Sequence, residues 1–221
     1  MKLSENRMNE ISLIAHSELF QRPWWSFPND IGSFDKISDN IIIETYDRLH
    51  PNYGAIRDFG DCITAPSETG YSLYNATNGM YIVVYNQNQY DKRQIWTLAH
   101  EFGHIALEHH KIAGVTYSSD LYDRFESEAN FFASEFLAPT PLIQHIEHEC
   151  GKVDQRDLEF VFSLSGEAAS YRLRDYKREK MFCKNRQHYS KELQLIFGER
   201  VLPEKVFYEM YVASFEKAVS L

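Results

Sequence analysis

The pentapeptide His100-Glu101-Phe102-Gly103-His104 combines residue types and a spacing that could do chemistry. Residues four apart lie on one face of a helix, so His100 and His104 can direct two imidazoles toward the same metal ion. Glu101 follows the first histidine, where its carboxylate can reach a water molecule bound to that metal. Two histidine ligands and a general base form the front half of a zinc hydrolase site.

The residues around this motif favour a helix that would hold the two histidines. Apolar side chains recur there at helical spacing and would share one face: Ile95, Leu98, Phe102, Ile105 and Ala106. Gly103 costs a helix roughly 1 kcal/mol relative to alanine, and a glycine is tolerated where another backbone passes close by. Because His-Glu-x-x-His also occurs by chance, the interpretation depends on a third ligand elsewhere in the chain.

A second acidic motif downstream can supply that third ligand. Glu126 and Asn130 are four residues apart on a predicted helix that begins near Asp120 and ends before Pro139. We predict Glu126 as the third zinc ligand and Asn130 as the hydrogen-bond partner that orients a ligating histidine. Glu128 lies roughly 200° around the helix from Glu126 and is the alternative ligand.

Together the two motifs resemble the ImmA/IrrE family of metallopeptidases. Its members show an Ala-His-Glu-Leu-Gly-His-like motif, then Glu-x-x-Ala-Asn-x-Phe-Ala ending in Leu-Met-Pro. Here Phe102 replaces the usual leucine, and Ala138 stands before Pro139 where methionine is common. The resemblance extends over residues 10–175 and implies an α+β fold, namely a mostly helical, zincin-like peptidase core with a small β-sheet.

The sequence itself also predicts a β region before the motif helix. Residues 71–74 and 80–85 are typical of strands, and Asn78-Gly79 is typical of a hairpin turn. The edge of such a sheet can hold an extended substrate by main-chain pairing. Residues 35–50 are expected to form a helix, although the β-branched Ile41-Ile42-Ile43 fits a strand equally well.

We expect three parts along the chain: a zinc metallopeptidase domain (1–153), a helix-turn-helix-like helical unit packed on it (154–175) and a C-terminal helical extension (176–221). The resemblance suggests the second part. In that part, Leu158, Val161 and Phe162 form one apolar face, and Ser165 can cap a following helix.

Composition excludes several classes of function. The chain has 221 residues and a formal net charge of −9, whereas nucleic-acid binders neutralise phosphates with Lys and Arg, so we expect no direct nucleic-acid binding. No apolar run approaches the roughly 18 residues of a membrane helix, and the N-terminus has no apolar signal core. Three scattered cysteines, Cys62, Cys150 and Cys183, define no disulfide framework. These features favour a cytoplasmic protein without a membrane partner, and they leave the oligomeric state open.

Other polar residues could compete for a functional role. We interpret His145 and His148 on a following helix, and also His109 and His110, as exposed polar residues. A peptidase site commonly adds a donor for the oxyanion, and the family-like tail suggests Tyr171 or Arg172 for it.

We therefore expect Zn²⁺ held by His100, His104 and Glu126, with Glu101 as the catalytic base. The resemblance implies a stress- or mobile-element-linked switch, common on phages, in which the peptidase cleaves a specific helix-turn-helix transcriptional repressor. The alternative is a non-catalytic regulatory or antitoxin-like binding module with a structural or vestigial metal site. The presence of Glu101 argues against that alternative, because a purely structural site needs no general base.

Overall fold

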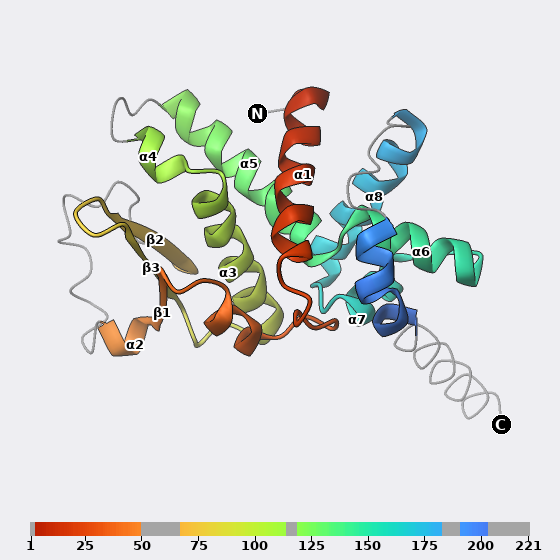
Figure 1. Cartoon of the computed structure of the whole chain (residues 1–221), viewed down its shortest axis with the longest axis horizontal. Helices are drawn as coiled ribbons and strands as arrows, with labels where there is room; N and C mark the ends of the chain where they lie inside the picture. The colour runs from red at the N-terminus through yellow and green to blue at the C-terminus, as the bar shows by residue number, and fades with distance from the viewer. Residues whose placement is uncertain (1–2, 50–66, 114–118, 183–190, 203–221) are drawn as a thin grey trace. The chain divides into compact units, whose positions relative to one another are not determined.

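The computed structural model describes residues 3–49, 67–113, 119–182 and 191–202. This part of the chain is mostly helical and contains a three-stranded mixed sheet, which is the α+β class that the sequence predicts (Figure 1). None of the helices described is both long and apolar enough to span a membrane. Residues 183–190 and 203–221 of the predicted C-terminal extension, which include Cys183, and Cys62 lie outside the described residues.

By its internal contacts the chain divides into two compact units, and each unit is discontinuous in sequence. The first unit comprises Met1–Ala15 and Ile31–Ala133, and the second comprises His16–Asp30 and Ser134–Leu221. The predicted domain limits at residues 153 and 175 stay predictions.

The sheet of the first unit has the strand order β1-β3-β2. Strand β1 (Ile41–Thr45) pairs in parallel with β3 (Met80–Tyr85), and β2 (Gly70–Asn75) pairs antiparallel with β3. The predicted hairpin between β2 and β3 is present, and Gly79 adopts a φ of 72°, a conformation that glycine adopts without steric cost.

The expected helix over residues 35–50 is wrong for most of its length. A 3₁₀ helix, η1 (Ile31–Lys36), comes first, and only the short α2 (Tyr46–Leu49) is α-helical. Ile41 pairs with Tyr81 of β3 in the sheet. The β-branched residues therefore form a strand, because β3 offers them a partner that local sequence cannot reveal.

Four helices complete the first unit: α1 (Glu5–Phe20), α3 (Asp91–Ala106), α4 (His109–Ala113) and α5 (Ser119–Leu137), of which α1 and α5 continue into the second unit. At the start of α1, the Ser4 hydroxyl accepts a hydrogen bond from the Arg7 N–H at 3.3 Å. The α3 helix packs on β2 and β3 (Figure 1). The sheet therefore forms the support on which the His-Glu-x-x-His helix lies.

The second unit contains α6 (Thr140–Cys150), α7 (Gln155–Val161), α8 (Gly166–Phe182) and a helical segment at 191–202. Asp154 and Asp157 form a reciprocal capping box at the start of α7. Ser165 accepts a hydrogen bond from the Ala168 N–H at 3.2 Å, as expected of a cap. The apolar face predicted before this cap, including Leu158, is buried.

A buried ionic cluster lies inside the second unit. Glu135 Oε1 lies 3.0 Å from Arg172 Nη2, and Glu135 Oε2 lies 2.9 Å from His16 Nε2. Arg172 also donates from Nε to the Ala138 carbonyl at 2.8 Å and is only 1% exposed. The suggestion of Arg172 as an oxyanion donor is therefore wrong, because its guanidinium is buried and binds Glu135 and the Ala138 carbonyl inside this unit. Tyr171 is 51% exposed.

Replacing Glu135 by alanine is expected to destabilise the protein by about 3–5 kcal/mol, because the buried Arg172 charge loses its partner. Burial alone would raise the pKa of Glu135, but Arg172 and His16 outweigh it and lower this pKa. The carboxylate therefore contributes stability above its unfolded pKa of about 4.3, and this contribution is lost as the pH falls below that value. Urea unfolding at pH 7 and pH 4 checks both effects. The matched control, Glu167→Ala on the exposed face of α8, is expected to stay within about 0.5 kcal/mol of the parent.

Candidate metal centre

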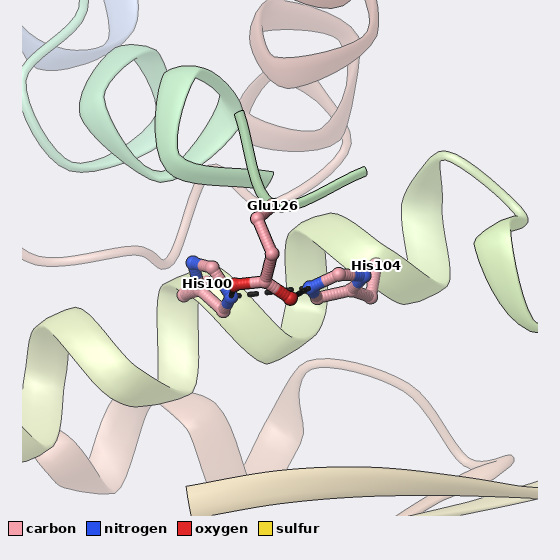
Figure 2. Close-up of side chains that lie close together, drawn as sticks. All are labelled: His100, His104 and Glu126. Carbon is pink, nitrogen blue, oxygen red and sulfur yellow. Dashed lines mark hydrogen bonds and ion pairs between the residues drawn. The ribbon is translucent and has the colours of Figure 1, made fainter. Parts of the chain in front are cut away.

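Two histidines of α3 and one glutamate of α5 point toward one another (Figure 2). His100 Nε2 lies 3.1 Å from His104 Nε2. The same nitrogens lie 3.4 Å from Glu126 Oε2 and from Glu126 Oε1, respectively. Within the described residues, these three side chains form a candidate metal-binding group whose ligand atoms lie within 4.8 Å of one another.

The spacing of these atoms fits zinc. Zinc bonds of about 2.0–2.2 Å to nitrogen and oxygen, arranged as a tetrahedron, place neighbouring ligand atoms roughly 3.3–3.5 Å apart. The two histidine nitrogens lie 3.1 Å apart, and each lies 3.4 Å from a different oxygen of the Glu126 carboxylate, which are separations close to these edges. Two imidazoles and one carboxylate are also a donor set found in zinc hydrolases, in which a fourth position stays open for water or substrate.

The charges of the group favour binding of a cation. Burial would raise the pKa of Glu126, but hydrogen bonds and charges of the two histidines lower this pKa, so the carboxylate is ionised. Burial lowers the pKa of His104 and favours its neutral, metal-binding form. Burial also disfavours the charged form of His100, but Glu126 and Glu101 outweigh it and raise the pKa of His100. A metal must therefore displace a proton from His100 at acidic pH.

Asn130 lies where the sequence predicts a partner for a histidine. Its Oδ1 atom is 3.1 Å from His100 Nδ1. Because His100 Nε2 faces the metal group, the hydrogen of the neutral ring belongs on Nδ1, from which it donates to this amide oxygen. The spacing of four residues between Glu126 and Asn130 thus brings both side chains to the same side of α5.

Glu101 is 7% exposed and lies on the strand side of α3. The Ser72 hydroxyl of β2 donates to Glu101 Oε2 at 2.5 Å. Burial raises the pKa of Glu101. Sequence reasoning missed Ser72, because a single serine in a strand carries no signal until α3 packs across that strand.

Glu128, the alternative ligand, lies elsewhere. It is 0% exposed and accepts hydrogen bonds from Arg7 at 2.6 Å and from Arg124 at 2.7 Å. The interpretation of His109 and His110 as exposed residues is wrong. His109 is 2% exposed, and His110 Nε2 lies 3.0 Å from the Ser72 hydroxyl. His148 is exposed, as expected.

A cavity of about 250 Å³ lies over the metal group. Its walls come from the β2 region, from α3 and from α5, and they include Thr69, Gly70, Trp96, Tyr122 and Asn130. The His100, Glu101, His104 and Glu126 side chains all line it. The candidate ligands and the candidate base therefore face the same space, which a reaction at a metal requires.

Gly103 explains how α3 and α5 approach closely enough to share this group. A Cβ atom at Gly103 would lie 3.2 Å from the Ala129 carbonyl oxygen and 3.0 Å from Phe132 Cδ1. The backbone approach expected at this glycine is therefore present.

Replacing Gly103 by alanine is expected to move α5, and Glu126 with it, by a few tenths of an ångström and to weaken zinc binding by roughly tenfold. Stability should change little, because the gain in helix propensity of about 1 kcal/mol offsets the crowding. Chelator competition measures the affinity. Gly166→Ala is the matched control, since its Cβ would meet nothing closer than 3.5 Å, and unchanged affinity in Gly103→Ala would contradict the account.

Comparison with known proteins agrees with this geometry. No curated protein sequence matches the chain significantly. The family model Peptidase M78, described as the IrrE N-terminal-like domain, matches residues 62–174. The match contains both motifs and all three residues of the metal group, and it spans just over half of the chain. The chain therefore belongs to the IrrE N-terminal-like family of metallopeptidase domains.

Proposed function

We propose that this protein is a zinc-dependent endopeptidase. The observation that carries the proposal is the convergence of His100, His104 and Glu126 on one point, beside the buried carboxylate of Glu101 and facing one cavity. Membership of a metallopeptidase family supports the same reading. A structural metal site would account for the three ligands, but it would not account for a second carboxylate, that of Glu101, in the lining of the cavity.

When bound, zinc would supply a Lewis acid for the peptide carbonyl and lower the pKa of water toward about 7. Glu101 would accept the proton of the attacking water and deliver it to the leaving amine. Burial raises the pKa of Glu101 in the metal-free protein, which favours its role as a proton acceptor. The Ser72 hydroxyl occupies Oε2, so Oε1 is the oxygen left for the transferred proton.

The substrate would lie along β2. In the described sheet this strand is at one end of the order β1-β3-β2, and three of its residues, Gly70, Tyr71 and Ser72, line the cavity. An extended peptide that pairs with a strand edge is held by main-chain hydrogen bonds and presents its carbonyl groups at regular intervals. This position would bring one peptide bond to Glu101.

We further propose that the substrate is a helix-turn-helix transcriptional repressor and that a signal gates its cleavage in a regulatory switch. The resemblance to the ImmA/IrrE family supports this part, and the net charge of −9 favours a protein over a nucleic acid as the partner.

Incubation of the zinc-loaded chain with the helix-turn-helix regulators encoded beside its gene tests the proposal. We expect cleavage of one regulator at one bond, inhibition by a chelator and recovery on adding zinc. Casein serves as an unspecific substrate. Cleavage of casein alone would indicate a sequence-tolerant peptidase. Binding of a regulator without cleavage would favour the non-catalytic module.

A further inference from the structure

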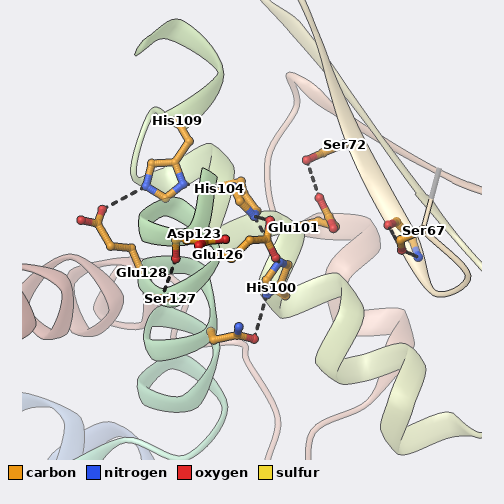
Figure 3. A network of polar contacts seen from close by, with 12 residues as sticks. Ser67, Ser72, His100, Glu101, His104, His109, Asp123, Glu126, Ser127 and Glu128 are labelled. Atoms are coloured by element: carbon orange, nitrogen blue, oxygen red, sulfur yellow. Dashed lines mark hydrogen bonds and ion pairs between the residues drawn. The ribbon is translucent and has the colours of Figure 1, made fainter. Parts of the chain in front are cut away.

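A hydrogen-bonded network of side chains leads from His104 away from the metal group, to His109 and Glu128 (Figure 3). His104 Nδ1 lies 3.0 Å from His109 Nδ1, and His109 Nε2 lies 3.1 Å from Glu128 Oε2. Figure 3 shows the His109 ring between the other two side chains. The three residues of this network come from α3, α4 and α5, and all belong to the first unit.

The role of His104 as a metal ligand determines which ring nitrogens of this network carry a hydrogen. Its Nε2 atom lies 3.4 Å from Glu126 Oε1, so this nitrogen needs its lone pair to bind a metal. A neutral imidazole then carries its hydrogen on Nδ1 and donates it to His109 Nδ1. His109 must accept there, so its own hydrogen is on Nε2 and is donated to Glu128. In this arrangement both rings are neutral: the first hydrogen bond joins His104 to His109, and the second joins His109 to the carboxylate of Glu128.

Glu128, at the end of the network away from the metal group, is held by two arginines. Arg7 Nη2 donates to Glu128 Oε2 at 2.6 Å, and Arg124 Nε donates to Glu128 Oε1 at 2.7 Å. Two guanidinium groups keep this fully buried carboxylate ionised, so it remains an acceptor for His109. The His109 ring stacks on Phe125 with centroids 4.0 Å apart and an interplanar angle of 9°, which restricts its orientation.

We infer that His109 is a positioning residue for the metal centre: it holds His104 in the tautomer that presents Nε2 to the metal, and Glu128 holds His109. The inference rests on the proposed zinc site. It also gives the alternative ligand Glu128 a different role, as the outer end of a carboxylate–histidine–histidine chain. Such a chain raises the basicity of the ligating nitrogen. His100, by contrast, is oriented by the neutral amide of Asn130.

A merely structural role for the same network makes a different prediction. Arg7, Arg124, His109 and Glu128 connect α1, α4 and α5, so removal of any of them could loosen the fold. Loss of stability alone would leave the zinc affinity of the folded chain unchanged. Zinc affinity and metal-free stability must therefore be measured separately on the full chain.

Three substitutions of His109 separate the two hydrogen bonds of its ring. Phenylalanine keeps a ring on Phe125 and removes both nitrogens. Asparagine places its amide oxygen near the position of Nδ1 and can still accept from His104. Glutamine places its amide near the position of Nε2, so it keeps the contact with Glu128 and loses the contact with His104.

Zinc affinity is measured by chelator competition, and metal-free stability is measured by urea unfolding. We expect His109→Phe and His109→Gln to raise the zinc dissociation constant by about 10–100-fold. We expect His109→Asn to recover at least half of the lost binding free energy, whatever its urea midpoint. If His109→Phe does not fold, the zinc affinities of His109→Gln and His109→Asn are compared instead, and a weaker affinity in the glutamine variant supports the inference.

Zinc affinity of His109→Gln within twofold of the parent would overturn the inference, and so would equal losses in the glutamine and asparagine variants. A parent chain that binds no zinc would overturn the proposed function as well. The two failures are thus distinguishable, because the first leaves zinc binding and peptide cleavage by the parent intact.

Discussion

Replacing Glu101 by glutamine is expected to abolish peptide cleavage and to leave zinc in place. Glutamine has nearly the same shape and can still accept the hydrogen bond from Ser72, but its amide cannot take a proton from water. Loss of a general base lowers the rate by about 10²–10⁴-fold. Zinc content should stay at the parental level, because Glu101 is not one of the three grouped ligands. Cleavage rate and zinc per chain are measured on the same preparation.

The control for this variant is Glu108→Gln, two residues after the end of α3. Glu108 is exposed and pairs with Lys111 on the surface, so its substitution should change neither cleavage nor zinc content. A Glu101→Gln variant that cleaves within tenfold of the parental rate would contradict the assigned base, even if zinc is bound.

Replacing Glu126 by alanine is expected to weaken zinc binding by more than about 100-fold, which exceeds the usual effect of residues that only orient a ligand. The variant loses one of three ligands and the negative charge that balances the cation. Cleavage should fall with it. Chelator competition measures the affinity, and urea unfolding without metal verifies that the chain is folded.

Ser127→Ala is the matched control for Glu126→Ala, because Ser127 is the next residue of α5, is not one of the three grouped ligands, and donates to the Asp123 carbonyl in its own helix. Zinc affinity should be unchanged in this control. Unchanged affinity in Glu126→Ala would instead require another third ligand.

Much of the candidate site follows from local spacing, because a regular helix converts spacing directly into geometry. The separation of four residues brings His100 toward His104, and it brings Glu126 and Asn130 to one side of α5. Gly103 likewise indicated a close backbone approach before the neighbouring helix was known.

His109 shows where local spacing stops being informative. The α3 helix ends at Ala106, and Glu108 adopts a φ of 58°, so the chain turns and brings His109 back beside His104. Helical periodicity does not extend through such a turn. The contact of Ser72 with Glu101 is equally invisible in sequence, since it depends on how α3 crosses the sheet.

The fold shows the same division between local and distant causes. The β2–β3 hairpin was predictable, because Asn78 and Gly79 specify a turn between two alternating segments. The segment at Ile41 was ambiguous, because its strand depends on pairing with β3, about forty residues later in the chain. Arg172 was misjudged for a similar reason: its partner Glu135 lies on another helix of the second unit.

Zinc per chain, measured on the full protein purified without added metal, tests the central claim most directly. We predict close to one zinc per chain in the parent and little or none in Glu126→Ala, with both proteins folded. A parent that holds no zinc, even after it is unfolded and refolded with excess zinc, would contradict the account, since Glu101 would then have no metal-bound water to act on.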